Sequence, residues 1–211
     1  MKMRYFGDSY DIVKLSLINW LGYLGDWSVH PMLTESATAD KIAAYERFLG
    51  AQVLSSEVLT TVTDRSSYLA CASECGHLFL DPDTGLKMKI TAGAKAPEYL
   101  FASELEYIIK SRPNSLTLVF DQSHQRGNER SSLEKKLNIL RSGGVYCFAY
   151  VSHACFIVGG NDENLVGKAL SDVMEKSKLP ESRFLHAALP NTHSRGRYAI
   201  KPPSSYPEPE H

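Results

Sequence analysis

Two spacings of hydrophobic residues divide the chain into predicted helices and predicted strands. Within residues 9–24, Ile12, Leu17 and Leu21 recur at close to helical spacing, and Ser9 stands where a helix cap is expected. The same spacing predicts five further helices, over residues 38–50, 64–76 (capped by Asp64), 102–112 (capped by Ser103), 129–144 and 164–178.

Apolar stretches that are rich in β-branched and aromatic residues predict the strands. These stretches cover residues 27–34, 51–62, 77–81, 115–123 and 145–160. The last stretch is long enough for two strands, with a turn near Ser152 and His153. Residues 87–100 are polar and contain glycine and proline, so we expect a loop there.

Strands alternate with helices from about residue 27 to residue 157. This order predicts an α/β fold, a three-layer α/β/α sandwich around a mainly parallel sheet. A chain of 211 residues is long enough for one sizeable core. We therefore expect one domain over residues 1–189, followed by a Pro- and Ser-rich flexible tail over residues 190–211.

Polar side chains suited to chemistry follow three of the predicted strands. Ligands bind at the carboxyl ends of the strands in open α/β sheets, so we expect these side chains to lie at one edge. They are His30, Thr34 and Glu35 after the first strand, Asp81, Asp83 and Thr84 after the third, and Asp121, Gln122, Ser123, His124 and Arg126 after the fourth.

The stretch HLFLDPDTGL, residues 77–86, places Asp81 and Pro82 directly after a buried strand. It resembles the catalytic loop of amino-methylating methyltransferases, in which the Asp side chain and the Pro carbonyl hold the substrate amine. The resemblance implies S-adenosylmethionine as cofactor. In this interpretation Asp83 and Thr84 replace the usual second proline and the stacking aromatic residue, and Asp121 lines the same pocket.

Two longer stretches extend the resemblance. YFGDSYDIVKLSLINWL, residues 5–21, resembles the N-terminal helix of ribosomal-RNA adenine-N6 methyltransferases. DRSSYLACASECGHLFLDPDTGL, followed by FDQSHQR, resembles uncharacterised bacterial proteins that carry Leu-Asp-Pro-Asp-Asn/Thr-Gly-Leu. The matching residues, scattered between about residues 4 and 160, are Gly7, Asp8, Asp11, Lys14, Thr34, Asp81, Pro82, Asp83, Gly85, Leu86 and Gln122.

These likenesses imply a Rossmann-like methyltransferase topology and transfer of a methyl group to an amino group of a nucleic acid or related substrate. The residues expected to bind the cofactor are Asp8, Lys14, His30 and Thr34. Those expected to bind the substrate are Thr84, Gln122, His124 and Arg126. Methyltransferases usually have a glycine-rich turn after the first strand, but VHPMLTE has no glycine. Either the cofactor binds differently, or the fold has lost it.

A second interpretation is metal-dependent hydrolysis. The same stretch is similar to the Asp-x-Asp start of haloacid-dehalogenase phosphatases, with Asp81 as nucleophile and Asp83 as general acid or base. Asp162 would then be a ligand of Mg²⁺. In a version that needs no family, a carboxylate cluster that includes Asp81, Asp83 and Asp121 would hold Mg²⁺ in a phosphoesterase or nuclease.

A third interpretation is a module that binds a nucleotide or a protein partner without catalysis, because a fold alone does not determine function. Each candidate also has a structural explanation. Asp-Pro-Asp-Thr-Gly is a common turn sequence, and Asp8 and Asp11 suit the first turn of a helix. His30 beside a proline is often a packing residue.

Composition limits the remaining possibilities. The formal net charge of −1 does not indicate an electrostatic nucleic-acid binder. No apolar run resembles a signal peptide or a membrane span, so we expect a cytoplasmic protein without membrane contact. Cys71, Cys75, Cys147 and Cys155 lack the paired spacing of a zinc site, so we expect ordinary buried thiols.

Overall fold

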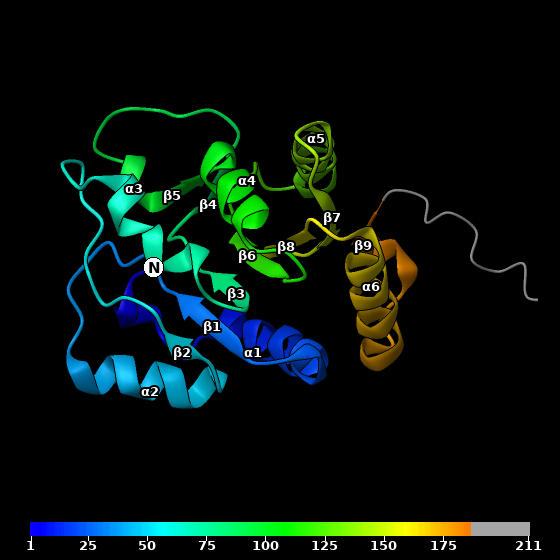
Figure 1. Cartoon of the computed structure of the whole chain (residues 1–211), viewed down its shortest axis with the longest axis horizontal. Helices are drawn as coiled ribbons and strands as arrows, with labels where there is room; N and C mark the ends of the chain where they lie inside the picture. The colour runs from blue at the N-terminus through cyan, green and yellow to red at the C-terminus, as the bar shows by residue number, and fades with distance from the viewer. Residues whose placement is uncertain (187–211) are drawn as a thin grey trace, which may run out of the picture.

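The structure, a computed structural model, describes residues 1–186. Those residues form an α/β protein whose seven-stranded sheet has helices on both faces (Figure 1). The strands of this sheet are β1 (Trp27–His30), β2 (Gln52–Val53), β3 (His77–Leu80), β6 (Thr117–Asp121), β7 (Tyr146–Tyr150), β8 (Cys155–Gly160) and β9 (Phe184–Leu185). The helices are α1 (Ser9–Leu21), α2 (Ala39–Leu49), α3 (Arg65–Tyr68), α4 (Ala102–Ser111), α5 (Glu129–Ser142) and α6 (Glu163–Ser177).

The strand order is β2-β1-β3-β6-β8-β7-β9. The first four strands are parallel, β8 is antiparallel to both of its neighbours, and β9 is antiparallel to β7. The prediction of an α/β fold with a mostly parallel sheet is therefore confirmed. So is the turn between β7 and β8, whose apolar residues pair along a hairpin from Tyr146–Gly160 to Tyr150–Phe156.

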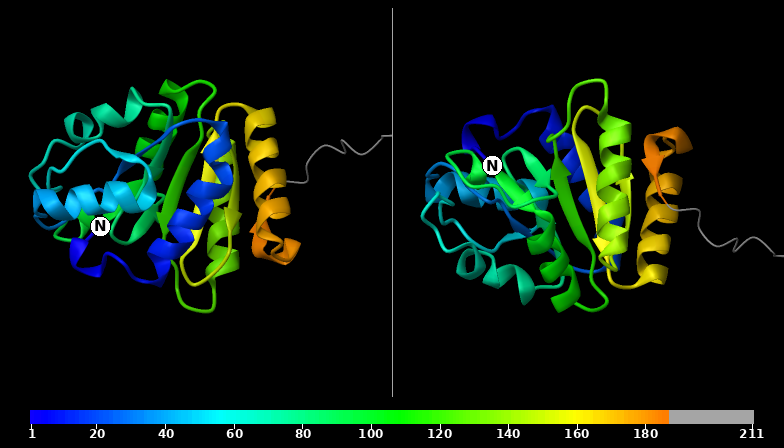
Figure 2. Two further views of the ribbon diagram at one scale, coloured as in Figure 1. Left: turned by 90° about the horizontal axis from the view of Figure 1, so that it is seen from below. Right: turned by 90° about the horizontal axis from the view of Figure 1, so that it is seen from above.

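Helices lie on both sides of the sheet (Figure 2), and an apolar layer of side chains fills each of the two interfaces. On one face, Leu17 of α1, Leu49 of α2 and Leu170 of α6 pack with Phe79 and Phe156 of the sheet. On the other face, residues of α3, α4 and α5 pack against alternate residues of the same strands. Strands that are apolar on both sides, such as β3 with four buried residues, fit between two helix layers.

The structure corrects several local predictions. Asp8, not Ser9, caps α1, because its carboxylate accepts the N–H groups of Tyr10 and Asp11. Ser103 does not cap α4; Glu104 accepts the N–H of Phe101 there instead. Asp64 caps α3 as predicted.

The segment expected to be a loop over residues 87–100 contributes to a second, two-stranded parallel sheet, β4 (Gly85–Lys87) and β5 (Tyr99–Phe101). This sheet escaped prediction because each strand has only three residues. By contrast, less strand forms over residues 51–62 than predicted: that segment contains only β2 and one isolated bridge, between Leu33 and Val58. The predicted tail over residues 190–211 lies outside the described residues.

Candidate functional site

A cavity of about 400 Å³ opens at the edge of the sheet where β3 and β6 end. We call it the β3 cavity, because Asp81 and Pro82 follow β3 directly. Helix α1 and the η1 turn (Met3–Tyr5) bring the N-terminal segment to the same edge (Figure 1). The lining residues are Met1, Lys2, Tyr5, Asp8, Tyr10, Asp11, Lys14, Asp81, Pro82, Asp83, Thr84, Glu98, Phe120 and Gln122.

Asp81 is the most deeply placed carboxylate of the cavity, with 1% of its surface exposed. Its Oδ2 accepts hydrogen bonds from Lys14 Nζ at 2.9 Å and from the Tyr45 hydroxyl at 2.7 Å. Both bonds fall on one oxygen, and no described group donates to Oδ1. The carbonyl of Pro82 likewise accepts no bond from a described donor. Asp81 Oδ1 and the Pro82 carbonyl are therefore the two unused acceptors of the Asp-Pro pair.

Lys14 joins two carboxylates across the floor of the cavity. Its Nζ lies 2.9 Å from Asp11 Oδ1 as well as from Asp81 Oδ2, and the side chain is 6% exposed. Burial alone would lower the pKa of Lys14, but the negative charges of Asp81 and Asp11 outweigh burial and raise it. Lys14 is therefore a fixed cation and not a base.

Tyr45 is a donor for the same reason. Burial, and next the charge of Asp81, raise the pKa of its hydroxyl well above the ordinary value, so the proton stays on oxygen. Asp11 is held from its other side, because its Oδ2 accepts the N–H of Gly7 at 2.7 Å. The network ties α1 and α2 to the end of β3.

The rim of the cavity is a second set of ion pairs. Lys2 Nζ lies 2.6 Å from Asp83 Oδ2 and 3.7 Å from Glu98 Oε1. The backbone N–H of Thr84 donates to the Glu98 carbonyl, and the N–H of Gln122 donates to the Thr84 carbonyl. Residues from four distant parts of the sequence thus meet at this rim.

Two aromatic rings in contact with each other form part of the wall. The centroids of Tyr10 and Phe120 lie 6.1 Å apart, with ring planes tilted by 54°. Lys14 Nζ lies 4.7 Å from the Phe120 centroid, a distance that suits a cation–π contact. The wall therefore combines carboxylates with aromatic faces.

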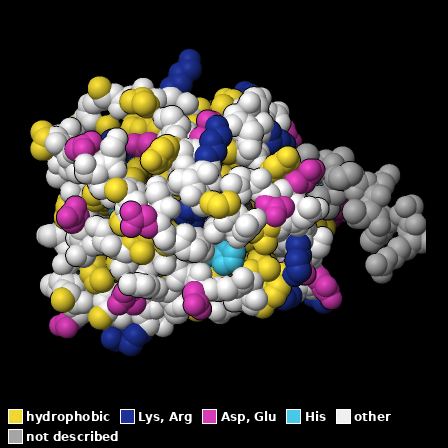
Figure 3. Space-filling view, in the orientation of Figure 1, with side chains coloured by type: hydrophobic (Ala, Val, Ile, Leu, Met, Phe, Trp, Pro, Cys, Tyr) yellow, Lys and Arg dark blue, Asp and Glu magenta, His cyan; other side chains and the backbone are white. Residues whose placement is uncertain are grey.

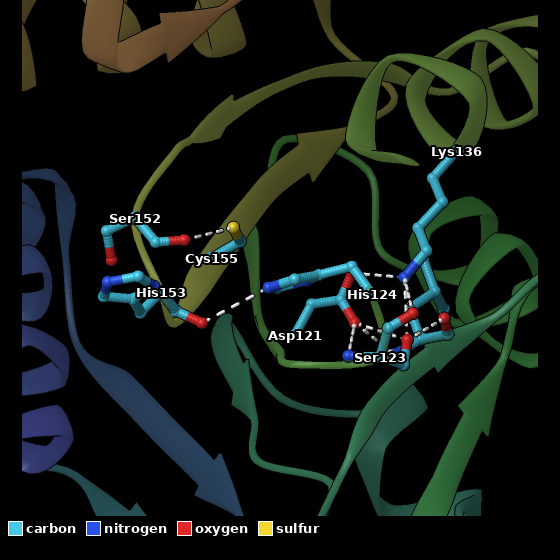
Figure 4. Close-up of polar contacts among 8 residues, drawn as sticks. Asp121, Ser123, His124, Lys136, Ser152, His153 and Cys155 are labelled. Carbon is cyan, nitrogen blue, oxygen red and sulfur yellow. Dashed lines mark hydrogen bonds and ion pairs between the residues drawn. The ribbon is translucent and has the colours of Figure 1, made fainter. Parts of the chain in front are cut away.

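Asp121 was predicted to line the same pocket, but it lies in a separate cluster with Ser123 and Lys136, the β6 cluster (Figure 4). Its Oδ2 pairs with Lys136 Nζ at 2.6 Å. Its Oδ1 accepts the N–H groups of Leu86 and Ser123 and the Ser123 hydroxyl. A Cβ on Gly85 would overlap Asp121 Oδ1, so only glycine lets β4 approach this closely.

Gln122 of that loop lines the β3 cavity, whereas Ser123, His124 and Arg126 lie outside it. His124 Nε2 contacts the carbonyl of His153 at 3.3 Å (Figure 4). Arg126 is exposed. Cys155 lies next to the cluster in β8, and burial raises the pKa of its thiol to about 12, so it is not a reactive thiolate.

His30 and Thr34, predicted to bind the cofactor, do not line the cavity. His30 is fully buried, and its Nε2 lies 3.2 Å from the Tyr68 carbonyl. Burial lowers its pKa to about 4, so it is neutral near pH 7. In the turn that follows, Met32 adopts a φ of 45° and its carbonyl accepts a hydrogen bond from the Met1 amino group, while the Thr34 N–H donates to the Met1 carbonyl. This turn is therefore closed by the N-terminal segment.

Seven of the predicted site residues do line the β3 cavity: Asp8, Lys14, Asp81, Pro82, Asp83, Thr84 and Gln122. Sequence reasoning missed Lys2, Tyr10 and Glu98 as lining residues. Tyr10 could have been found, because it lies between the matching residues Asp8 and Asp11 on one helix. Lys2 and Glu98 had no such signal, because they lie outside every motif.

The carboxylates of the proposed metal site are dispersed and paired with lysines. Asp81, Asp83 and Asp121 contact Lys14, Lys2 and Lys136, respectively. Within residues 1–186 no three His, Cys, Asp or Glu side chains are grouped as metal ligands. Asp162 caps α6 through the N–H groups of Asn164 and Leu165. The four cysteines are free thiols; Cys147 and Cys155 are buried as predicted, whereas Cys71 and Cys75 are only half-buried.

Charges of both signs are interspersed on the face shown in Figure 3, without a large basic patch. None of the helices in the described part of the chain is long and apolar enough to span a membrane. In comparisons with known proteins, the chain matches no family model, no curated protein and no solved structure. The function is therefore argued from the β3 cavity itself.

Proposed function

We propose that this protein is methyltransferase-like: the β3 cavity binds S-adenosylmethionine, and Asp81 and Pro82 hold the amino group that receives the methyl group. The observation that carries the proposal is the pair of unused acceptors, Asp81 Oδ1 and the Pro82 carbonyl, in a cavity at the end of a central parallel strand. Ligands of open α/β sheets bind at such ends. A volume of about 400 Å³ lies within the range of small-molecule sites.

The charge balance of the cavity supports a cationic ligand. Two lysines among the lining residues face five carboxylates, which belong to Asp8, Asp11, Asp81, Asp83 and Glu98. A sulfonium is attracted to such a wall, whereas a phosphate would be repelled by it. The same balance counts against a phosphoesterase, which must bind an anionic substrate.

The aromatic rings supply the stacking surface that the motif lacks. Thr84 stands where the related loops carry an aromatic residue, and Asp83 before it is engaged with Lys2. Tyr10 and Phe120 lie in the wall of the same cavity and offer faces for a planar base. We therefore assign stacking against the base to Tyr10 and Phe120 and not to a residue of the loop.

The fit of the cofactor differs between the two sides of the site. The turn after β1 offers no glycine, and the N–H groups of Met32 and Thr34 already donate to His30 and Met1. On the α1 side, Asp8 Oδ1 accepts two backbone N–H groups and Oδ2 accepts no bond from a described donor, so this carboxylate can accept a ribose hydroxyl or an ammonium. We therefore assign cofactor binding to α1 and the Asp-Pro loop, not to His30 and Thr34.

When bound, the cofactor supplies an electrophilic methyl group. The chain's part is to orient the amine. Two hydrogen bonds from the amine, to Asp81 Oδ1 and the Pro82 carbonyl, would fix its lone pair in one direction. Lys14 and Tyr45 hold the Asp81 side chain in place through its Oδ2, which leaves Oδ1 directed by that geometry toward the amine.

A binding module without catalysis is the second candidate. The observation that favours it is the closed turn after β1, where Met1 contacts the Met32 carbonyl and the Thr34 N–H. The two candidates make the same prediction for binding of the cofactor and different predictions for methyl transfer.

The test is a thermal-shift titration with S-adenosylmethionine, its demethylated product and Mg²⁺. About 100 Kd of a ligand that binds only the folded state adds about 2.7 kcal/mol of stability. We expect both nucleosides to stabilise the protein and Tyr10→Ala to abolish the thermal shift. Tyr107 is an exposed tyrosine outside the cavity, so we expect Tyr107→Ala to keep the shift.

A shift with Mg²⁺ alone would contradict the proposal and favour hydrolysis. The two candidates are separated by radiolabelled methyl transfer to amino-bearing nucleosides and RNA. If the nucleosides bind but no labelled product forms, the result contradicts methyl transfer and favours the binding module.

A further inference from the structure

The N-terminal segment, residues 1–5, forms one wall of the β3 cavity through Met1, Lys2 and Tyr5. The backbone of this segment is held in place, because the Met1 carbonyl accepts the Thr34 N–H at 3.1 Å and the Met3 side chain is buried in the core. The Lys2 side chain is the part of this wall that reaches across the rim.

Lys2 and Lys14 are both cations of this cavity, but they are held differently. Lys14 is 6% exposed and bonds to two carboxylates at 2.9 Å. Lys2 is 25% exposed, with one carboxylate at 2.6 Å and the other at 3.7 Å. A four-carbon stem lets the Lys2 ammonium leave for solvent by rotation of the side chain, without movement of the backbone.

The backbone segments that carry the two partners of Lys2 are held together by a hydrogen bond. Glu98 follows Pro97 in the η4 turn, and its carbonyl accepts the Thr84 N–H at 2.8 Å. Asp83 belongs to the same loop as Asp81 and Pro82, and its side chain is 10% exposed. If the Lys2 side chain rotates into solvent, Asp83 and Glu98 remain at the rim without a cation. Their partial burial makes that arrangement unfavourable.

We infer that the Lys2 ammonium occupies the place of the ligand's own ammonium between Asp83 and Glu98, and that a ligand enters by displacing it. The inference rests on the proposed function and adds to it a ligand class: a nucleoside that carries a primary ammonium. Lys2 is then an internal competitor that lowers affinity for such ligands and closes the rim in their absence. The hydrogen bond to Asp83 raises the pKa of Lys2, so the competitor is charged.

The experiment compares two nucleosides by isothermal titration calorimetry. S-adenosylhomocysteine carries the ammonium, and methylthioadenosine has the same nucleoside without the amino-acid group, so it lacks both the ammonium and the carboxylate. In Lys2→Met, we expect the affinity for S-adenosylhomocysteine to rise about fivefold, the size set by loss of one partly exposed ion pair. The affinity for methylthioadenosine is expected to stay the same.

Two further variants complete the design. Arg4→Met removes a cation that pairs with Glu35 outside the cavity, and it should change neither affinity. Asp83→Asn should weaken binding of S-adenosylhomocysteine and leave methylthioadenosine unaffected. Thermal denaturation of each variant checks that the fold is retained.

Each outcome has one meaning. If both nucleosides bind the wild type and Lys2→Met changes neither affinity, the inference is wrong while the proposed function stands. If Lys2→Met strengthens both nucleosides equally, Lys2 is only a steric barrier, and the ammonium subsite is wrong. If no variant binds either nucleoside, the proposed function fails and the inference fails with it.

Discussion

Two neighbouring strands of the sheet, β3 and β6, end in a buried aspartate that pairs with a buried lysine. Asp81 bonds to Lys14 and Asp121 bonds to Lys136, and all four side chains are at most 7% exposed. The difference lies in the remaining donors. Asp121 receives two backbone N–H groups and a hydroxyl, whereas Asp81 receives only side-chain donors on a single oxygen.

This difference separates a structural carboxylate from one that is available to a ligand. The β6 cluster uses Asp121 to join β4 to the loop after β6, with both oxygens engaged. The β3 cavity keeps one oxygen of Asp81 open. A buried charge pair at a strand end is therefore not evidence of a site until its lone pairs have been assigned.

The largest effect should come from removing the charge of each aspartate in turn. Asp121→Asn leaves Lys136 without a carboxylate, so we expect a loss of about 3 kcal/mol or more in the free energy of unfolding. Asp81→Asn should cost only about 1–2 kcal/mol, because Lys14 keeps Asp11 as its partner. Urea denaturation of both variants measures the two losses. Equal losses would contradict the difference between a structural Asp121 and an available Asp81.

The close approach of β4 to Asp121 can be tested through glycine. Gly85 has a φ of 132°, and an added Cβ would also lie 2.8 Å from the Asp121 Cα. Gly93 has a φ of 112° with open space around it, so it is the matched control. We expect Gly85→Ala to cost about 2–3 kcal/mol more than Gly93→Ala, because only the first adds a clash to the backbone strain. Equal costs in denaturation experiments would show that β4 can move away from Asp121.

A third strand end, that of β1, makes a smaller and pH-dependent contribution. The pKa of His30 is lowered from 6.5 to about 4 by burial, so between these values the unfolded chain binds the proton more readily than the folded one. Stability from this group is complete above pH 6.5 and is lost as the pH falls toward 4, by an amount on the order of 3 kcal/mol at the low end. When the pH falls only from 7 to 5.5, the loss of stability from His30 is smaller than the loss on reaching pH 4.

His30→Gln keeps a polar side chain and removes this titration. We expect the wild type to lose more stability than the variant between pH 7 and pH 5.5, as measured by urea denaturation at each pH. Parallel pH profiles for the two proteins would show that His30 titrates normally, and would reopen its role as a ligand-binding residue.

The sequence predicted the order of helices and strands well, because apolar spacing alone distinguishes α5 from β6. It also located Asp81, Pro82, Asp83 and Thr84 at a strand end. It could not separate Asp81 from Asp121, since the donors to Asp121 are backbone groups that leave no residue pattern.

The partners that complete the β3 cavity were unpredictable for a related reason. Tyr45 contacts Asp81 from 36 positions away, and Glu98 reaches the rim through a two-stranded sheet too short to be recognised. His30 follows a strand like the two aspartates, but it packs inward under Tyr68. Only tertiary contacts determine which of these ends lines the β3 cavity.

Amide hydrogen exchange of the wild-type protein, with and without S-adenosylhomocysteine, tests the central claim most directly, because it maps the ligand without disturbing either aspartate. Binding in the β3 cavity predicts slower exchange in residues 8–14 and 83–86, with no change in residues 129–142 beside the β6 cluster. Protection confined to residues 123–142, or no protection anywhere, would contradict the assignment of the β3 cavity as the ligand site.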